Sequence, residues 1–382
     1  MIAGRTRDEH LFGPGPKRIL ALDGGGVRGI ISLAYLERLE SILRQRFGPE
    51  TVLADYFDLI GGASTGAIIA TGLALGLPVK RLIATFLGLA DKGFRRSSRF
   101  AFLAPKFQAG ALVEQIRAHV GDTTLGSAQV KTGLAIIAKR IDTGSLWVFH
   151  NNPRGRWFDV AGRDPHAAPN KDLKLTQLLR ASTAAPSYFA PEPIEIAHGV
   201  SGTFIDGAVS PHGNPGLFLF LLATLGGYGF RWPTGAEQLL LASVGTGHHP
   251  MTPSRMPAKH APPLLLAALA LKSVMDDCNW LNQTMLQYLG QSPAPWRIDG
   301  EIGDLTGDQL GVAPAFHYLR YDMVYSSHWF DGEIGVRLEQ RELDGLTRFD
   351  EPAISPRLLE LARLAARKQI AEAHLPAEFD MG

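Results

Sequence analysis

Ser64 lies in the pentapeptide Gly62-Ala63-Ser64-Thr65-Gly66, which has the G-x-S-x-G spacing of a nucleophile elbow. A strand is expected before it at Phe57–Ile60, and a helix is expected after it at Ala67–Ala74. Small residues on both sides let the chain turn sharply, so the serine hydroxyl stands at the end of a sheet with a helix N-terminus beneath it. The pattern therefore predicts a nucleophile for acyl transfer at Ser64 rather than a plain Gly/Ser turn.

A serine nucleophile needs a base, and the sequence offers two candidates. Asp206 follows a short apolar run and enters a glycine turn in Phe204-Ile205-Asp206-Gly207-Ala208. The pair His248-His249 would instead complete a hydrolase triad in the chain order serine, acid, histidine. We favour Asp206, although Asp-Gly is also a common turn sequence. Since a carboxylate with the ordinary pKa of about 3.9 is a weak base, its apolar neighbours are expected to raise that pKa.

The loop Asp23-Gly24-Gly25-Gly26-Val27-Arg28-Gly29 has two interpretations. Its G-x-G-x-x-G spacing matches a dinucleotide-binding loop, but the next strand then has to end in an acid for the ribose. That strand ends in the elbow instead. We therefore expect the backbone N–H groups of Gly24, Gly25 and Gly26 to form an oxyanion hole beside the serine. Arg28 is expected to stabilise this loop or an anionic head group, with a simple salt bridge as the alternative.

The elements that must position these residues are strands followed by glycine loops and helices. An apolar run at 18–22 leads into the first loop and a helix with apolar positions between Ile30 and Leu39, and the elbow repeats this order. Further strands are expected at 133–139, 146–150 and 239–244. This alternation predicts an α/β protein with a mainly parallel central sheet flanked by helices and with a helical C-terminal part.

Composition and charge exclude several classes of protein. With 45% hydrophobic residues the chain is globular, and 38 Lys and Arg against 37 Asp and Glu do not favour a nucleic acid polymer as partner. Its single cysteine, Cys278, suits a reducing compartment, and the charged start contains no secretory signal. We expect a cytoplasmic protein without a membrane-spanning segment. No metal-binding spacing occurs, so no metal or cofactor is expected.

Three blocks in this order resemble the patatin-like phospholipases: Asp23–Gly29, Gly62–Gly66 and Asp206–Ala208. The segment Arg180–Phe189 is similar to the Ala/Ser-rich stretch before the family's catalytic aspartate, and Gly245-Thr246-Gly247 to a later block. The resemblance implies a Ser64–Asp206 dyad, an oxyanion hole at Gly24, Gly25 and Gly26 with Arg28 beside it, and no metal. One departure is the segment Ser210–Pro215. The family often has two asparagines before a proline there, and this chain has only Asn214.

The resemblance also suggests how the chain is divided. We expect an N-terminal tail at 1–16, a catalytic domain at 17–335 whose motifs lie within 17–250, and a helical extension at 336–382. The C-terminal segment Pro356–Leu375 has the apolar spacing of a packed amphipathic helix.

Two uncharged runs bear on the substrate, Leu217–Leu222 and Pro262–Leu271. They are either buried packing helices or an acyl-chain channel and docking surface. With the resemblance, they lead us to expect a phospholipase A that cleaves carboxylic esters of glycerophospholipids at a membrane surface, as a peripheral protein. The alternative is a catalytically silent scaffold that senses lipid or nucleotide.

Aromatic residues between 280 and 329, with two arginines among them, form either core or a ligand site that stacks and clamps a nucleotide. This plan is similar to the lipase effectors of cyclic-oligonucleotide antiphage systems. It implies a cyclic oligonucleotide activator, an antiviral role and a homo-oligomer on activation. The residues concerned are Trp280, Trp296, Arg297, Tyr318, Arg320, Tyr321, Tyr325 and Trp329.

Overall fold

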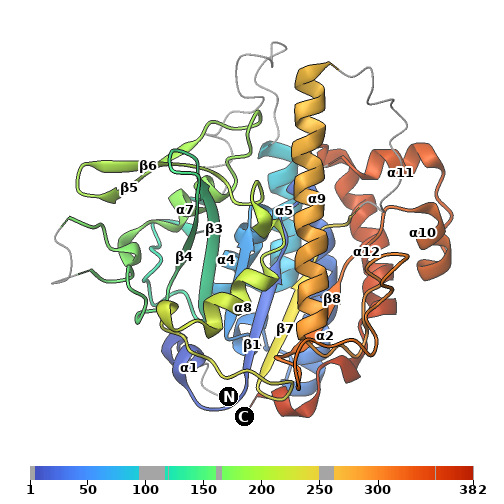
Figure 1. Cartoon of the computed structure of the whole chain (residues 1–382), viewed down its shortest axis with the longest axis horizontal. Helices are drawn as coiled ribbons and strands as arrows, with labels where there is room; N and C mark the ends of the chain where they lie inside the picture. Colours follow the sequence, from blue (N-terminus) through green and yellow to red (C-terminus); the bar gives the residue numbers. More distant parts are fainter. Residues whose placement is uncertain are drawn as a thin grey trace.

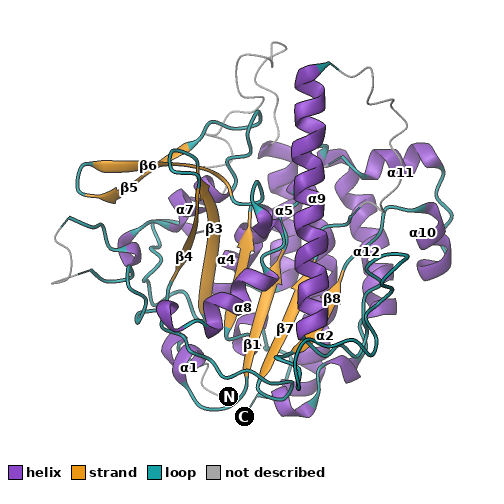
Figure 2. Ribbon diagram, viewed as in Figure 1, coloured by secondary structure: helices purple, strands orange, loops and turns teal. Residues whose placement is uncertain are grey.

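The protein is described by a computed structural model, which places residues 5–93, 117–118, 120–160, 166–248, 262–348 and 350–381. Within these ranges eight strands form one sheet in the order β5-β6-β3-β2-β1-β7-β8, with β4 paired to β3 (Figure 2). The five strands β3, β2, β1, β7 and β8 are parallel, and β4, β5 and β6 run antiparallel to their partners. The expected α/β fold with a mainly parallel sheet is confirmed. The strands are β1 Lys17–Leu22, β2 Leu59–Ala63, β3 Gly133–Arg140, β4 Ser145–His150, β5 Glu192–Ala197, β6 Val200–Asp206, β7 Leu239–Val244 and β8 His317–Tyr321.

Helices cover both faces of this sheet (Figure 1). Side chains of a strand alternate between faces, so Leu20 and Leu22 of β1 join one core cluster, while Ile19 and Ala21 join the other. The first cluster includes α2, α4, α5, α7 and α12, and the second includes α8 and the C-terminal end of α9. The helices are α1 Arg7–Phe12, α2 Gly29–Phe47, α3 Leu53–Tyr56, α4 Thr65–Ala74, α5 Val79–Gly93, α7 Leu175–Ser182, α8 Gly216–Thr224, α9 Pro263–Leu289, α10 Ser327–Ile334, α11 Gln340–Leu346 and α12 Ser355–Gln369.

The strands expected at 133–139, 146–150 and 239–244 are present within one residue of their limits as β3, β4 and β7. The strand expected at 57–60 begins two residues later, at Leu59. Before it, the buried Asp58 carboxylate accepts the Arg18 N–H at 2.9 Å and pairs with the Arg18 guanidinium at 3.0 Å. Asp58 lies in a bend, whereas the sequence pattern predicted a strand there.

Strand β8 was not expected, yet it extends the parallel sheet beyond β7. The C-terminal part also packs on the same core, because α12 lies along α2. Leu358, Leu361 and Ala362 of α12 are buried, and the Arg363 guanidinium pairs with Glu37 of α2 at 2.6 Å. The Phe379 carbonyl accepts an N–H of Arg18 at 3.1 Å, so the C-terminal segment lies at the start of β1. No helix within the described ranges is long and apolar enough to span a membrane.

The packing of α12 predicts that Leu361→Ala destabilises the protein by about 2–5 kcal/mol, because a buried leucine is replaced by a cavity. The thermal midpoint of unfolding, followed by circular dichroism, should fall clearly. Lys368→Ala, on the exposed side of the same helix, serves as the control and should leave the midpoint nearly unchanged. Equal midpoints for both variants would contradict the packing of α12 on the core.

Candidate active site

Ser64 occupies a sharp turn between β2 and α4. Its backbone has φ 56° and ψ −127°, a conformation that non-glycine residues rarely adopt. The flanking glycines are required by space: a Cβ on Gly62 would lie 2.3 Å from the Gly66 carbonyl carbon, and a Cβ on Gly66 would lie 2.2 Å from the Leu22 carbonyl oxygen. The spacing of the pentapeptide thus follows from the close approach of α4 to β1 and β2.

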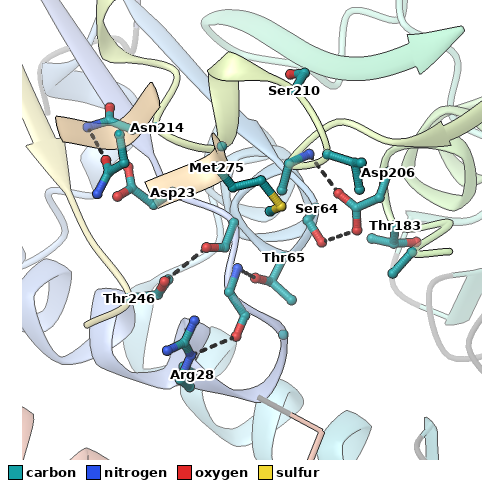
Figure 3. A pocket seen from close by; sticks show the side chains of 18 of the residues that line it. Asp23, Arg28, Ser64, Thr65, Thr183, Asp206, Ser210, Asn214, Thr246 and Met275 are labelled. Carbon is teal, nitrogen blue, oxygen red and sulfur yellow. Dashed lines mark hydrogen bonds between the residues drawn. The ribbon is translucent and has the colours of Figure 1, made fainter. Parts of the chain in front are cut away.

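Strand β3 brings Asp206 to this serine. Ile137 of β3 pairs with Ala63, the last residue of β2, and the next residue, Ala138, pairs with Asp206, the last residue of β6. Strand β6 therefore continues along β3 at the point where β2 ends. The Ser64 hydroxyl donates a hydrogen bond of 2.7 Å to Asp206 Oδ2 (Figure 3).

The environment of Asp206 makes its carboxylate a better base. The residue is 4% exposed, and burial raises the pKa of its carboxyl to about 6. The Ser64 hydroxyl, the Ala208 N–H at 2.8 Å and the charge of Arg180 act against this increase, because each stabilises the ionised form. The carboxylate thus has the raised basicity expected from its apolar neighbours, and is still largely ionised at neutral pH.

Ser182, at the end of α7, braces both members of the pair. Its hydroxyl accepts the Ser64 N–H at 2.9 Å and donates to the Ile137 carbonyl at 2.6 Å. Its carbonyl accepts the Gly207 N–H at 3.2 Å. The only sequence signal for this role was the Ala/Ser-rich stretch at 180–189, which gave no indication of which serine would serve.

The glycine loop lies beside the serine, but its three N–H groups are not equivalent. The Gly24 N–H donates to the Gly213 carbonyl at 2.9 Å, so the expectation that Gly24 is an oxyanion donor is corrected. The Gly25 N–H donates to the Thr65 hydroxyl at 3.1 Å, a partner that can rotate away. For Gly26, which has φ +61°, the structure records no acceptor within the described residues. Gly25 and Gly26 are therefore the available donors.

Arg28 contacts the same loop. Its Nε lies 3.4 Å from the Gly25 carbonyl, and its guanidinium lies 5.7 Å from the centre of the Tyr325 ring. Within the described part of the chain the contacts recorded for its guanidinium are with this carbonyl and this ring, and none is an ion pair with a carboxylate. The loop contact predicted from the sequence is present, and the simple salt bridge is not.

His248, the alternative base, lies elsewhere in the cavity. Its Nδ1 is 3.4 Å from Asp322 Oδ2, while Ser64 already bonds to Asp206. His249 falls outside the described residues. The geometry thus supports a serine–aspartate pair rather than a triad.

The pair opens into a cavity of about 620 Å³. The lining includes the glycine loop and a largely apolar wall, toward which Met275 of α9 projects (Figure 3). Of the two uncharged runs, Pro262–Leu271 contributes Leu271, whereas Leu219 and Leu222 of the other run are buried in the core under the sheet. The principal apolar lining residues are Ile68, Phe86, Phe189, Val209, Leu271 and Met275.

The aromatic cluster proposed to bind a nucleotide is largely core. Tyr318, Tyr321 and Tyr325 are at most 4% exposed, and Tyr318 donates to Gln283 Oε1 at 2.7 Å. Arg320 is enclosed between Asp23 and Asp322. These four residues cannot clamp a ligand in this conformation, so that part of the hypothesis is corrected.

Comparisons with known proteins agree with the motif order. A family model described as patatin-like phospholipase matches residues 20–215. Patatin-03 from Solanum tuberosum is 29% identical over 245 residues, and patatin group J-1 from the same organism is 28% identical over 246 residues. Each alignment covers 60% of this chain and 60% of the relative, so the chain spans less than two thirds of the relatives it matches.

Two solved structures also align with the chain. Human GIVD cytosolic phospholipase A2 has 12% identity and a TM-score of 0.43, with coverage of 95% of this chain and 59% of that one. VipD from Legionella pneumophila has 10% identity and a TM-score of 0.34, with coverage of 91% and 67%. At such low TM-scores neither likeness carries an argument about this chain.

The raised pKa of Asp206 predicts how the reactivity of Ser64 depends on pH. Below about pH 6 the carboxylate becomes protonated and cannot accept the serine proton. The rate constant for labelling of Ser64 by a fluorophosphonate should therefore fall about tenfold per pH unit below that midpoint. A rate that does not vary with pH, or a midpoint near the ordinary carboxyl value of about 3.9, would contradict the assignment.

The control for this measurement is Asp23→Asn. Asp23 also lines the cavity, and burial raises the pKa of its carboxyl to about 6 against the lowering effect of Arg320. Since its carboxylate does not contact Ser64, this variant should keep the midpoint. A midpoint that moves in Asp23→Asn would assign the titration to Asp23 instead.

Proposed function

This chain belongs to the patatin-like phospholipase family, and from that premise we propose that it is a lipid acyl hydrolase that uses Ser64 and Asp206 as a catalytic dyad. One observation carries the proposal: the Ser64 hydroxyl donates to the buried Asp206 carboxylate at 2.7 Å, at the wall of a largely apolar cavity. The pair combines a nucleophile, a base of raised pKa and neighbouring N–H donors, which are the groups that acyl transfer requires.

The reaction then proceeds in two steps. Ser64 Oγ attacks the ester carbonyl carbon while its proton passes to Asp206 Oδ2, and the carbonyl oxygen becomes an oxyanion held by the N–H groups of Gly25 and Gly26. The alcohol leaves with the proton from Asp206, and the acyl group stays on Ser64. Water then attacks the acyl-enzyme carbonyl while its proton passes to Asp206, and Ser64 Oγ leaves with that proton as the fatty acid is released.

The substrate class we propose is the carboxylic esters of glycerophospholipids. The cavity offers apolar side chains to an acyl chain, and burying such a chain contributes about 0.8 kcal/mol per methylene. On α9, beside the cavity, Leu265, Leu266 and Leu271 are 40%, 47% and 51% exposed. These exposed leucines support our proposal that the protein binds a phospholipid surface as a peripheral protein. A cytoplasmic location stays a prediction from the sequence.

The proposed dyad predicts that Ser64→Ala abolishes fatty-acid release from phospholipid vesicles, because the acyl acceptor is removed without opening a core cavity. Asp206→Asn should reduce the rate at least about 10³-fold, since the members of a catalytic unit act together. Release is measured by quantifying free fatty acid, with circular dichroism as a check that both variants fold.

His248→Ala is the control, since His248 lines the same cavity but contacts Asp322 rather than Ser64. Its release should stay within about tenfold of the wild type. If His248→Ala were as damaging as Asp206→Asn, the triad interpretation would replace the dyad. Vesicles left intact by the wild-type protein would favour the alternative function, a silent scaffold that senses lipid or nucleotide.

Activation by a cyclic oligonucleotide, with assembly into a homo-oligomer and an antiviral role, stays a prediction. Trp280, Trp296 and Trp329 are half-buried and Arg297 is exposed, so these four remain candidates for contact with such a ligand. We expect a rise in fatty-acid release of at least about tenfold with the cognate nucleotide, together with faster sedimentation. Full release in its absence, unchanged across a panel of such nucleotides, would remove this prediction.

A further inference from the structure

Arg320 is a buried arginine of β8 that reaches the glycine loop from two strands away. Its Nη2 lies 2.8 Å from Asp23 Oδ2 and its Nη1 lies 3.2 Å from Asp23 Oδ1, so the guanidinium binds the carboxylate with both terminal nitrogens. The register of the sheet explains the reach. Ala21, Ser243 and Arg320 pair in one row across β1, β7 and β8, and Asp23 lies two residues beyond Ala21, on the same face.

The same guanidinium also holds the loop that follows β7. Its Nη1 donates to the Ser243 hydroxyl at 2.7 Å, and its Nη2 lies 2.7 Å from Asp322 Oδ2. Asp322 Oδ1 in turn accepts the Gly247 N–H at 2.7 Å. Although burial raises the pKa of the Asp322 carboxyl, Arg320, His248 and the Gly247 N–H outweigh it and keep that pKa at about 2.

The loop after β7 presses directly against the glycine loop. The Thr246 hydroxyl donates to the Gly24 carbonyl at 2.9 Å, and a Cβ on Gly25 would lie 2.2 Å from Thr246 Oγ1. The peptide units of Gly24 and Gly25 are therefore held by Asp23 on one side and by Thr246 on the other. Both supports depend on the same guanidinium.

We propose that Arg320 is a positioning residue of the reaction, which fixes the N–H groups of Gly25 and Gly26 where the oxyanion develops. This inference rests on the proposed function. The residue lies outside the stretch 20–215 that the family model matches, so the match assigns it no role. The guanidinium makes four contacts, two with Asp23 and one each with Ser243 and Asp322. A lysine ammonium has only three N–H donors and would lose part of this network.

The chain contains a matched control pair at the opposite ends of the strands. Arg18, at the start of β1, binds Asp58 with its Nε 3.0 Å from Oδ2 and its Nη2 3.4 Å from Oδ1. Arg18 is 4% exposed and Asp58 is fully buried, as in the pair of Arg320 and Asp23, which are 6% exposed each. Arg18→Lys therefore perturbs a similar buried ion pair without touching the loops around Ser64.

The test compares Arg320→Lys with Arg18→Lys, using hydrolysis of a soluble p-nitrophenyl ester and thermal unfolding. We expect both variants to lower the unfolding midpoint. Arg320→Lys should also reduce kcat about 10²-fold, as when an oxyanion donor is lost, with KM changed less than about threefold. Arg18→Lys should keep kcat within about threefold. The pH midpoint near 6 should persist in Arg320→Lys, because Asp206 is untouched.

A second variant covers the case in which Arg320→Lys does not fold. Asp23→Asn keeps the shape of the side chain and should cause the same fall in kcat, and the double variant should fall no further than either single one. If kcat in Arg320→Lys and Asp23→Asn matches that in Arg18→Lys, the positioning role is overturned while the proposed function stands. If the wild type neither hydrolyses esters nor reacts with a fluorophosphonate, the proposed function fails and this role fails with it.

Discussion

The hydrogen bond between Ser64 and Asp206 is the interaction on which the arrangement of the site depends, and its geometry is set by the register of β3. The parallel strand β2 and the antiparallel strand β6 use consecutive positions of the same partner, Ile137 and then Ala138. A shift of one residue would turn every side chain of the shifted strand to the other face of the sheet. Ser64 and Asp206 are thus aligned by backbone hydrogen bonds.

This alignment requires backbones to approach very closely at the ends of the strands. Glycines at 62 and 66 let α4 pack against β1 and β2, and Gly207 lies where a Cβ would come within 2.2 Å of the Ile137 carbonyl oxygen. The positive φ of Ser64 is tolerated because the packed sheet and helix leave no alternative path for the chain. The well-packed core around the turn therefore maintains the strained backbone conformation of Ser64.

The buried carboxylates around the cavity differ in the direction in which the protein shifts their pKa values. Asp206 has only hydroxyl and N–H partners and a more distant charge from Arg180, so burial raises its pKa, from 3.8 to about 6. The folded protein then binds that proton more tightly than the unfolded chain does, and about 3 kcal/mol of stability is lost as the pH rises from about 4 to about 6. Asp322 is paired with Arg320 and stays ionised. Asp206 is therefore suited to proton transfer and Asp322 to holding a loop, while burial keeps the pKa of Asp23 at about 6 although Arg320 also pairs with it.

The sequence by itself determined the α/β alternation, the elbow at Ser64, the glycine loop and the choice of Asp206, because each depends on local spacing of glycines and apolar residues. It did not indicate β8, because the five residues His317–Tyr321 (HYLRY) neither alternate strictly between polar and apolar side chains nor form an uninterrupted apolar run. Only the tertiary structure decided that the Gly24 N–H is occupied, that Ser182 braces the dyad and that Arg320 lies beneath the glycine loop. These contacts join residues far apart in the chain, and such pairings arise from the register of strands and the packing of helices, which local spacing does not encode.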